Sequence, residues 1–295
     1  GIDSPDFNLP VEAAVRKAGI TSVQYVSPQV WAWRQSRVRS IRESTDLVLC
    51  LLPFETAFYE QHGVPAVFVG HPLADEIALE VDAKSARTDL GVGPGDKVLA
   101  LLPGSRTSEV TRLARPFAET AAWLQHRHPG LRILAAITND KLRKTFLDRT
   151  RDIALDPPVQ SVIGDARSVM AASDVVLTAS GTASLEIALH KRPMVVAYII
   201  SGLTHRLLRF MGLNELEYFS LPNLLAGRGC VAEYLQRDVR ADVLGPALER
   251  YLEPGSEVED LRETFLSLHS TLRRNASQRA ASAIADVIYG VSLDR

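Results

Sequence analysis

A chain of 295 residues can hold two domains or one large one, and 46% hydrophobic with 23% charged residues is typical of a folded globular protein. The sequence contains 33 Lys and Arg and 35 Asp and Glu, so it has no excess of basic residues, and nucleic acid is not an expected partner. No apolar run approaches the roughly 18 residues of a membrane span, and there is no signal peptide, so we expect a cytoplasmic protein.

The chain opens on Gly1-Ile2-Asp3, which reads as the end of a strand. Since a domain seldom starts at that point, we expect an N-terminal segment to be missing. A first series of alternating helices and strands follows. Its helices are predicted at 9–18 and 54–62, with a basic helical stretch from Arg34, and its strands at 21–26, 47–52 and 66–69.

A polar, Gly-rich stretch at 80–95 is predicted to link this series to a second one. The second series has predicted strands at 97–102, 131–137, 159–163, 174–178 and 193–199, and predicted helices at 109–128, 140–150, 165–172 and 183–190. Two further helices are predicted, at 239–252 and 258–289.

These elements predict an α/β fold with two Rossmann-like domains facing a cleft, the first incomplete, and a helical C-terminus. The predicted limits are 1–80 for the first domain, 81–253 for the second, and 254–295 for helices that pack back on the first. In open α/β sheets ligands bind beyond the carboxyl ends of the strands, so the loops that follow strands are the candidate sites.

The turn Ser180-Gly181-Thr182 joins a buried strand to a helix. Gly181 permits close approach of backbone to a ligand, and Ser180 and Thr182 are predicted helix caps. A helix N-terminus in this setting favours phosphate, with Glu186 one turn further in for sugar hydroxyls. An ordinary turn between strand and helix is the alternative.

A second loop of this kind is Pro103-Gly104-Ser105-Arg106. Gly104 and Ser105 offer backbone donors, and the Arg106 guanidinium suits a pyrophosphate. The alternative is a Pro-Gly turn with a solvated Arg106. Neither loop has a Walker or a dinucleotide-binding pattern, which disfavours kinases and dehydrogenases.

In the first loop, Asp3 directly ends its strand and is a candidate general base, whereas Asp6 is expected to cap a helix. No Asp-x-Asp pair and no zinc spacing are present, so neither a metal nor any other cofactor is expected. Negative charge on a leaving group is then expected to be stabilised by helix N-termini and Arg106.

Two of the three tryptophans, Trp31 and Trp33, lie in the segment Ser27-Pro28-Gln29-Val30-Trp31-Ala32-Trp33-Arg34. Their faces suit sugar rings or acyl chains, and core packing is the alternative. Asn223, in a short apolar loop at 221–227, either binds substrate or ties the loop together.

Taken together, these segments resemble the lipid-A-disaccharide synthases. The resemblance rests on segments in family order along nearly the whole chain, at 1–8, 25–34, 52–55, 68–75, 101–106, 179–186, 193–198 and 220–227. The Trp31 segment and the segment 221–227 are the most specific to this family, whereas the Ser180 turn occurs more widely among two-domain glycosyltransferases.

The resemblance implies an inverting glycosyltransferase that joins UDP-2,3-diacylglucosamine to 2,3-diacylglucosamine 1-phosphate through a β-1,6 bond and releases UDP. It implies catalytic roles for Asp3, Arg106 and Asn223, with Asp3 as base. UDP is then expected at Gly104, Ser105, Arg106, Ile163, Ser180, Gly181, Thr182, Ala183 and Glu186. The acceptor and its lipid chains are expected at Asn8, Ser27, Pro28, Trp31, Trp33 and Arg34.

This chain has Ile199 where the family often has Lys or Arg. The family context also implies peripheral association with the inner membrane and allows a homodimer. Two other functions stay open: a UDP-sugar epimerase on the same fold, and a truncated chain that binds UDP without chemistry.

Overall fold

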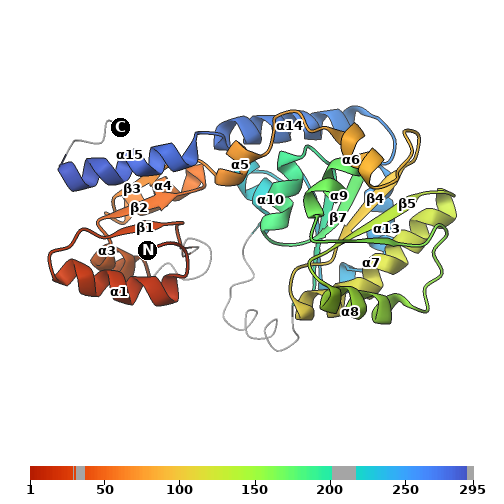
Figure 1. Cartoon of the computed structure of the whole chain (residues 1–295), viewed down its shortest axis with the longest axis horizontal. Helices are drawn as coiled ribbons and strands as arrows, with labels where there is room; N and C mark the ends of the chain where they lie inside the picture. Colours follow the sequence, from red (N-terminus) through yellow and green to blue (C-terminus); the bar gives the residue numbers. More distant parts are fainter. Residues whose placement is uncertain (29, 31–36, 201–216, 291–295) are drawn as a thin grey trace. The chain divides into compact units, whose positions relative to one another are not determined.

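The computed structural model describes residues 1–28, 30, 37–200 and 217–290. The chain divides into two compact units, Gly1–Ala78 with His269–Arg295 and Leu79–Leu268, which we describe one at a time (Figure 1). No helix within the described ranges is long and apolar enough to cross a membrane. The domain limits at 80 and 253 stay predictions.

The first unit is built on a three-stranded parallel sheet in the order β1-β2-β3. Its strands are β1 (Val23–Tyr25), β2 (Leu47–Cys50) and β3 (Ala66–Phe68). The helices are α1 (Pro5–Lys17), α3 (Val38–Ser44), α4 (Pro53–Gln61), α5 (Pro72–Glu76) and α15 (Ala276–Tyr289).

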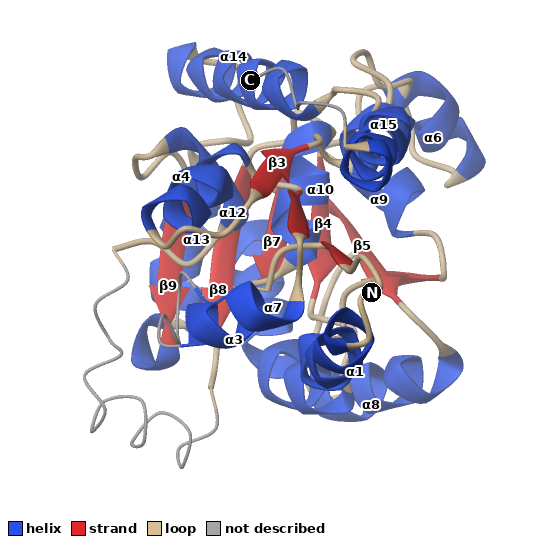
Figure 2. Cartoon of the chain, turned by 90° about the vertical axis from the view of Figure 1, so that its left-hand side faces the viewer, coloured by secondary structure: helices blue, strands red, loops and turns tan. Residues whose placement is uncertain are grey.

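Both faces of this sheet are covered, as a parallel sheet requires. On one face, Val48 and Cys50 of β2 pack with apolar residues of α1, α3 and α4. On the other, Leu47 and Leu49 pack against Ala280 of α15. Figure 2 shows α1 and α3 on the side of the short strands opposite α15.

Two helix predictions that involve this unit are wrong, one at its start and one in its middle. Helix α1 begins at Pro5 rather than at residue 9, because proline suits the first turn, where its missing N–H needs no partner. Asp6 therefore lies in the first turn of α1 and does not cap it. The single helix predicted at 258–289 is broken at Asn275, whose φ of 56° is left-handed, and α14 (Ser256–Leu272) precedes the break.

The second unit holds a six-stranded, all-parallel sheet in the order β6-β5-β4-β7-β8-β9. Its strands are β4 (Val98–Leu102), β5 (Arg132–Ile137), β6 (Gln160–Ile163), β7 (Val175–Ala179), β8 (Met194–Tyr198) and β9 (Ala232–Leu235). The helices are α6 (Ala83–Asp89), α7 (Thr107–Arg127), α8 (Asp140–Thr150), α9 (Ala166–Ala172), α10 (Thr182–Leu189), α12 (Leu221–Ala226), the short 3-10 helix η2 (Gln236–Asp238) and α13 (Ala241–Glu249).

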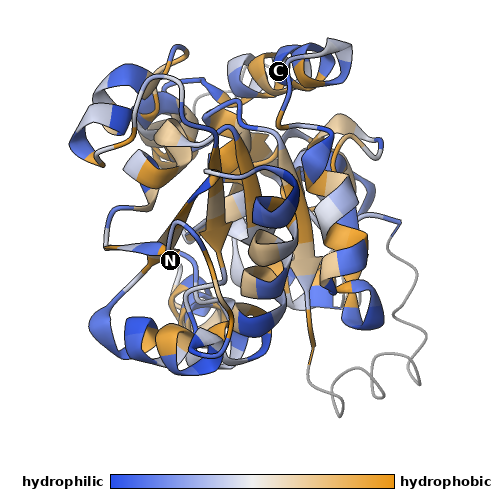
Figure 3. Ribbon diagram, turned by 90° about the vertical axis from the view of Figure 1, so that its right-hand side faces the viewer, coloured by the Kyte–Doolittle hydropathy of each residue, from blue (hydrophilic) through white to orange (hydrophobic). Residues whose placement is uncertain are grey.

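Every residue of β4 and β7 is buried, since helices cover both faces of the sheet. Figure 3 shows these central strands as hydrophobic and the surrounding helices as mixed. Three features differ from the sequence prediction. The stretch predicted as a link at 80–95 contains helix α6. Strand β9 was not predicted, and the predicted loop at 221–227 is the helix α12 followed by Gly227, whose φ of 63° ends it.

Candidate functional site

The order of strands in the second unit places two candidate loops side by side. The chain runs from β4 outward to β6, then returns to β7 on the other side of β4 and continues to β9. Strands β4 and β7 are paired, with Leu102 beside Thr178 near their carboxyl ends. The loops after these two strands, Pro103–Arg106 and Ser180–Gly181, therefore flank the topological switch point, where ligands bind in open α/β sheets.

Helix α10 begins at this switch point without a side-chain cap. Its N-cap is Gly181, with φ 144° and ψ −162°, a conformation open only to glycine. The prediction that Ser180 and Thr182 cap this helix is therefore wrong. A Cβ added at Gly181 would meet nothing within 4 Å, so space beside the helix N-terminus is open to an anion.

The loop after β4 is organised by Glu109, a residue that the sequence reading did not single out. One oxygen of its buried carboxylate accepts hydrogen bonds from the N–H groups of Ser105 and Arg106, at 3.0 and 3.2 Å. The backbone donor that Ser105 was predicted to offer to a phosphate is thus held by this carboxylate. Glu109, three residues after the N-cap Arg106, supplies the reciprocal half of a capping box, and a Glu at this spacing is visible in the sequence. The Arg106 side chain has no acceptor and does not supply the other half.

What the β4 loop offers outward is the Arg106 side chain. Its guanidinium lies 3.3 Å from Glu109 Oε1, yet the side chain is 77% exposed. Gly104 has a φ of 108°, and a Cβ there would lie 2.4 Å from the Glu109 carboxylate. The loop therefore requires glycine for packing, while Arg106 keeps a cation at the switch point.

Glu186 lies on α10 and is paired with a residue of the neighbouring helix α9. Its Oε1 accepts from Nε of Arg167 at 2.8 Å, and its side chain is 20% exposed. Arg167 was not predicted as a site residue; its place in the first turn of α9, after the loop that follows β6, is the signal that marks it. The pair brings a second cation and a carboxylate to the carboxyl edge of this sheet.

The other UDP residues predicted from the resemblance lie at the same edge. Ile163 ends β6 and is 37% exposed, which leaves an apolar side chain at the surface. Asp165 caps α9 by accepting from Ser168 N–H, and hydrogen bonding from Ser168 lowers the pKa of its carboxyl. Ala183 is in the first turn of α10.

Asn223 is fully buried in α12, and its amide is saturated. Its Nδ2 donates to Val231 O at 2.9 Å and to Glu233 Oε1 at 2.7 Å. Its Oδ1 accepts from the N–H groups of Cys230 and Val231, both at 2.8 Å. The side chain therefore ties α12 to the segment that leads into β9, and a catalytic role for it stays a prediction.

In the first unit, Asp3 is exposed and lies at the carboxyl end of the short strands. Its N–H donates to Tyr25 O at 2.9 Å, and the amide of Asn8 donates to Asp3 O at 2.7 Å. Ser27 is buried, and its hydroxyl donates to the Tyr59 hydroxyl at 3.0 Å. Pro28 is buried as well. Of the predicted acceptor residues, Trp31, Trp33 and Arg34 lie outside the described residues.

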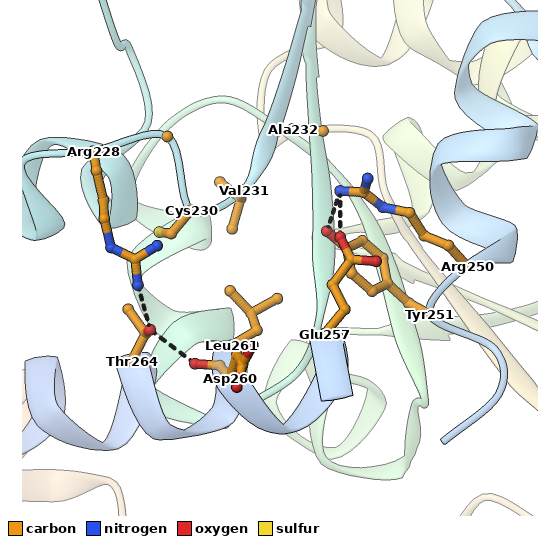
Figure 4. A pocket seen from close by; sticks show the side chains of 11 residues that line it. Arg228, Cys230, Val231, Ala232, Arg250, Tyr251, Glu257, Asp260, Leu261 and Thr264 are labelled. Atoms are coloured by element: carbon orange, nitrogen blue, oxygen red, sulfur yellow. Dashed lines mark hydrogen bonds and ion pairs between the residues drawn. The ribbon is translucent and has the colours of Figure 1, made fainter. Parts of the chain in front are cut away.

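A hollow at the amino end of β9 lies away from these loops. Figure 4 shows Arg228 and Arg250 on its two sides. Arg228 donates to Thr264 Oγ1 at 2.9 Å, and Arg250 pairs with Glu257 at 3.1 Å. Since these groups satisfy one another, we assign no ligand here. Within the described part of the chain, no group of three or more His, Cys, Asp or Glu is arranged to hold a metal ion.

Comparison with known families shows the family to which the chain belongs. The sequence profile of the lipid-A-disaccharide synthetase family matches residues 1–285. The chain belongs to this family. It is 46% identical over 288 residues to the lipid-A-disaccharide synthase of Pseudoalteromonas translucida, covering 98% of this chain and 74% of the relative. It is 49% identical to that of Alkalilimnicola ehrlichii, covering 96% and 74%.

The solved structures that resemble the chain show its fold. A UDP-GlcNAc 2-epimerase from Neisseria meningitidis superposes with a TM-score of 0.62 at 12% identity, over 94% of this chain and 73% of the other. WaaG, a glycosyltransferase involved in lipopolysaccharide biosynthesis, superposes with a TM-score of 0.52 at 17% identity, over 91% and 75%. The predicted α/β glycosyltransferase fold with a helical C-terminus is confirmed, and the family makes the chain a glycosyltransferase of lipid A biosynthesis.

Proposed function

We propose that the chain joins UDP-2,3-diacylglucosamine to 2,3-diacylglucosamine 1-phosphate by a β-1,6 bond and releases UDP. The proposal rests mainly on one observation: the uncapped N-terminus of α10 at Gly181 and the exposed side chain of Arg106 both lie at the same switch point. Both favour a diphosphate, and their charge complements the charge that grows on a UDP leaving group.

In this proposal the second unit holds the donor. The α10 N-terminus and Arg106 bind the diphosphate, Glu186 accepts from ribose hydroxyls, and Ile163 lies beside uracil. Arg167 keeps the Glu186 carboxylate in place through their 2.8 Å contact. No metal or other cofactor takes part, because the fixed cations and the helix dipole neutralise the leaving group.

Asp3 of the first unit acts as general base in the same proposal. As the acceptor's 6-oxygen attacks C1 of the donor sugar, its proton passes to the Asp3 carboxylate. The C1–oxygen bond to UDP breaks and UDP leaves with the electron pair, so the configuration at C1 is inverted. Both proposed substrates carry acyl chains, which supports peripheral association of the protein with the cytoplasmic face of the inner membrane. A homodimer stays a prediction.

The test is incubation of the chain with both lipid substrates and analysis of products by mass spectrometry. We expect a disaccharide 1-phosphate and UDP in equal amounts. Asp3→Asn is expected to lower kcat by about 100-fold or more, the scale of general base catalysis, with UDP affinity unchanged. An epimerised UDP-sugar as product, or UDP binding without any product, would instead support one of the two alternative functions.

A further inference from the structure

Left-handed backbone is concentrated around the candidate base. Asp3 has a φ of 49°, Ser4 of 40° and Val26 of 72°. Ile2 and Tyr25 form a parallel bridge, so the chain segments that end at these two residues lie side by side. Asp3 and Ser4 follow the first segment, and Val26 follows the second. A β-branched residue such as Val26 rarely adopts a positive φ, and such conformations persist only where surrounding contacts impose them.

Gln24 supplies those contacts from within the sheet. Its side chain is fully buried, and its Nε2 lies within hydrogen-bond distance of Asp3 O at 3.0 Å, Tyr25 O at 3.3 Å and Val26 O at 3.2 Å. One amide group thus holds carbonyls of both segments. Two of these carbonyls belong to left-handed residues, Asp3 and Val26.

Asn8 binds the same loop from α1. Its Nδ2 donates to Ile2 O at 3.0 Å and to Asp3 O at 2.7 Å. The Asp3 carbonyl therefore accepts from two side-chain amides, and the Asp3 N–H is fixed by Tyr25 O. The backbone of Asp3 is held at both ends of the residue, while its carboxylate stays exposed.

We propose that Gln24 is a positioning residue that fixes the left-handed backbone of Asp3 for proton transfer. The inference rests on the proposed function, in which Asp3 is the base. Without the Gln24 amide, Asp3 can relax toward ordinary backbone angles, which displaces its carboxylate. A displacement of about 1 Å can lower a rate by about 100-fold.

The test compares Gln24→Met with Gln125→Met in the transfer assay. Gln125 is a matched control, because it is also buried and its Nε2 donates to the carbonyls of Leu131 at 2.8 Å and Pro157 at 2.9 Å, in the second unit. We expect Gln24→Met to lower kcat by about 10- to 100-fold with little change in the KM for the UDP-sugar. Gln125→Met is expected to keep kcat.

A double variant separates positioning from general loss of structure. If Gln24 acts through Asp3, then Gln24→Met lowers kcat no further in an Asp3→Asn background. An equal additional loss in that background would overturn the inference, as would wild-type kcat for Gln24→Met. If Gln24→Met does not fold, Asn8→Ala must show the same non-additivity with Asp3→Asn, or the inference is overturned.

Failure of this inference and failure of the proposed function give different results. No transfer by the unmodified chain would overturn the proposed function and the inference with it. Transfer by the unmodified chain with wild-type kcat for Asp3→Asn would leave the reaction standing and overturn the base role of Asp3, on which the inference rests. A large loss for Asp3→Asn with full activity for Gln24→Met would overturn the inference alone.

Discussion

Replacement of Asn223 by alanine is expected to act first on stability. The buried amide satisfies three backbone groups, the carbonyl of Val231 and the N–H groups of Cys230 and Val231. Each buried polar group left without a partner costs about 1–3 kcal/mol of unfolding free energy. With the lower value for each of the three groups, the variant loses about 3 kcal/mol of stability. In a domain of 150–250 residues, about 2–4 °C per kcal/mol gives a Tm lower by about 6–12 °C.

Thermal unfolding followed by circular dichroism measures this shift, and Asn139→Ala is the matched control. Asn139 loses only one hydrogen bond, its 3.0 Å cap to Leu142 N–H, so about 1 kcal/mol is expected. UDP affinity, measured below the unfolding transition of both variants, shows whether the donor site survives. An Asn223→Ala variant with unchanged Tm and a large loss of kcat would refute this reasoning and favour direct catalysis by Asn223.

Three further predictions concern single residues. Gly104→Ala is expected to lower Tm and weaken UDP binding, because a Cβ there would lie 2.4 Å from the Glu109 carboxylate; unchanged calorimetric titration and Tm would contradict this. Burial lowers the pKa of His71, whose Nδ1 accepts from the N–H of Leu73. The unfolded chain therefore binds more protons than the folded chain, and we expect the free energy of unfolding in urea to fall as the pH drops below about 6.5. His71→Asn keeps the cap without titrating, and it should flatten that fall; an identical pH slope would contradict this. Asp75→Ala removes the carboxylate that accepts from the N–H groups of the N-cap Asn275 at 2.9 Å and of Ala276, the first residue of α15, at 2.6 Å. The loss should cost about 1 kcal/mol in urea unfolding, and an unchanged unfolding free energy would contradict this.

The sequence was most informative where strands are buried. The runs that became β4 and β7 are apolar at nearly every position, which is typical of central parallel strands. Strand β9 carries Glu233 and Tyr234 and is only half-buried at the edge of the sheet, so it lacks that signal. Helix α12 differs from the short apolar loop predicted at 221–227, although Pro222 suits the first turn of a helix and Gly227 its end.

Contacts between distant residues were beyond a reading of local patterns. The N–H groups at the break before α15 donate to Asp75, about which the sequence near Asn275 holds no information. Small residues and Arg106 mark the candidate loops in the sequence. The role of Glu109 is not visible there, because it depends on the Glu109 carboxylate folding back to accept from the backbone of the preceding loop. Gln24 looks like an ordinary strand residue, and only its place between two left-handed segments marks it.

The central claim is that UDP binds at the switch point between β4 and β7. Calorimetric titration of UDP into the unmodified chain, Arg106→Ala and Arg127→Ala tests it most directly. Arg127 is the last residue of α7, about 30 Å along the helix from Arg106, and it pairs only with Glu249 among the salt bridges of the described residues. We expect Arg106→Ala to weaken UDP binding by about tenfold or more, the scale of one charge-assisted contact, and Arg127→Ala to leave it unchanged. Equal UDP affinity in the unmodified chain and in Arg106→Ala would contradict the claim.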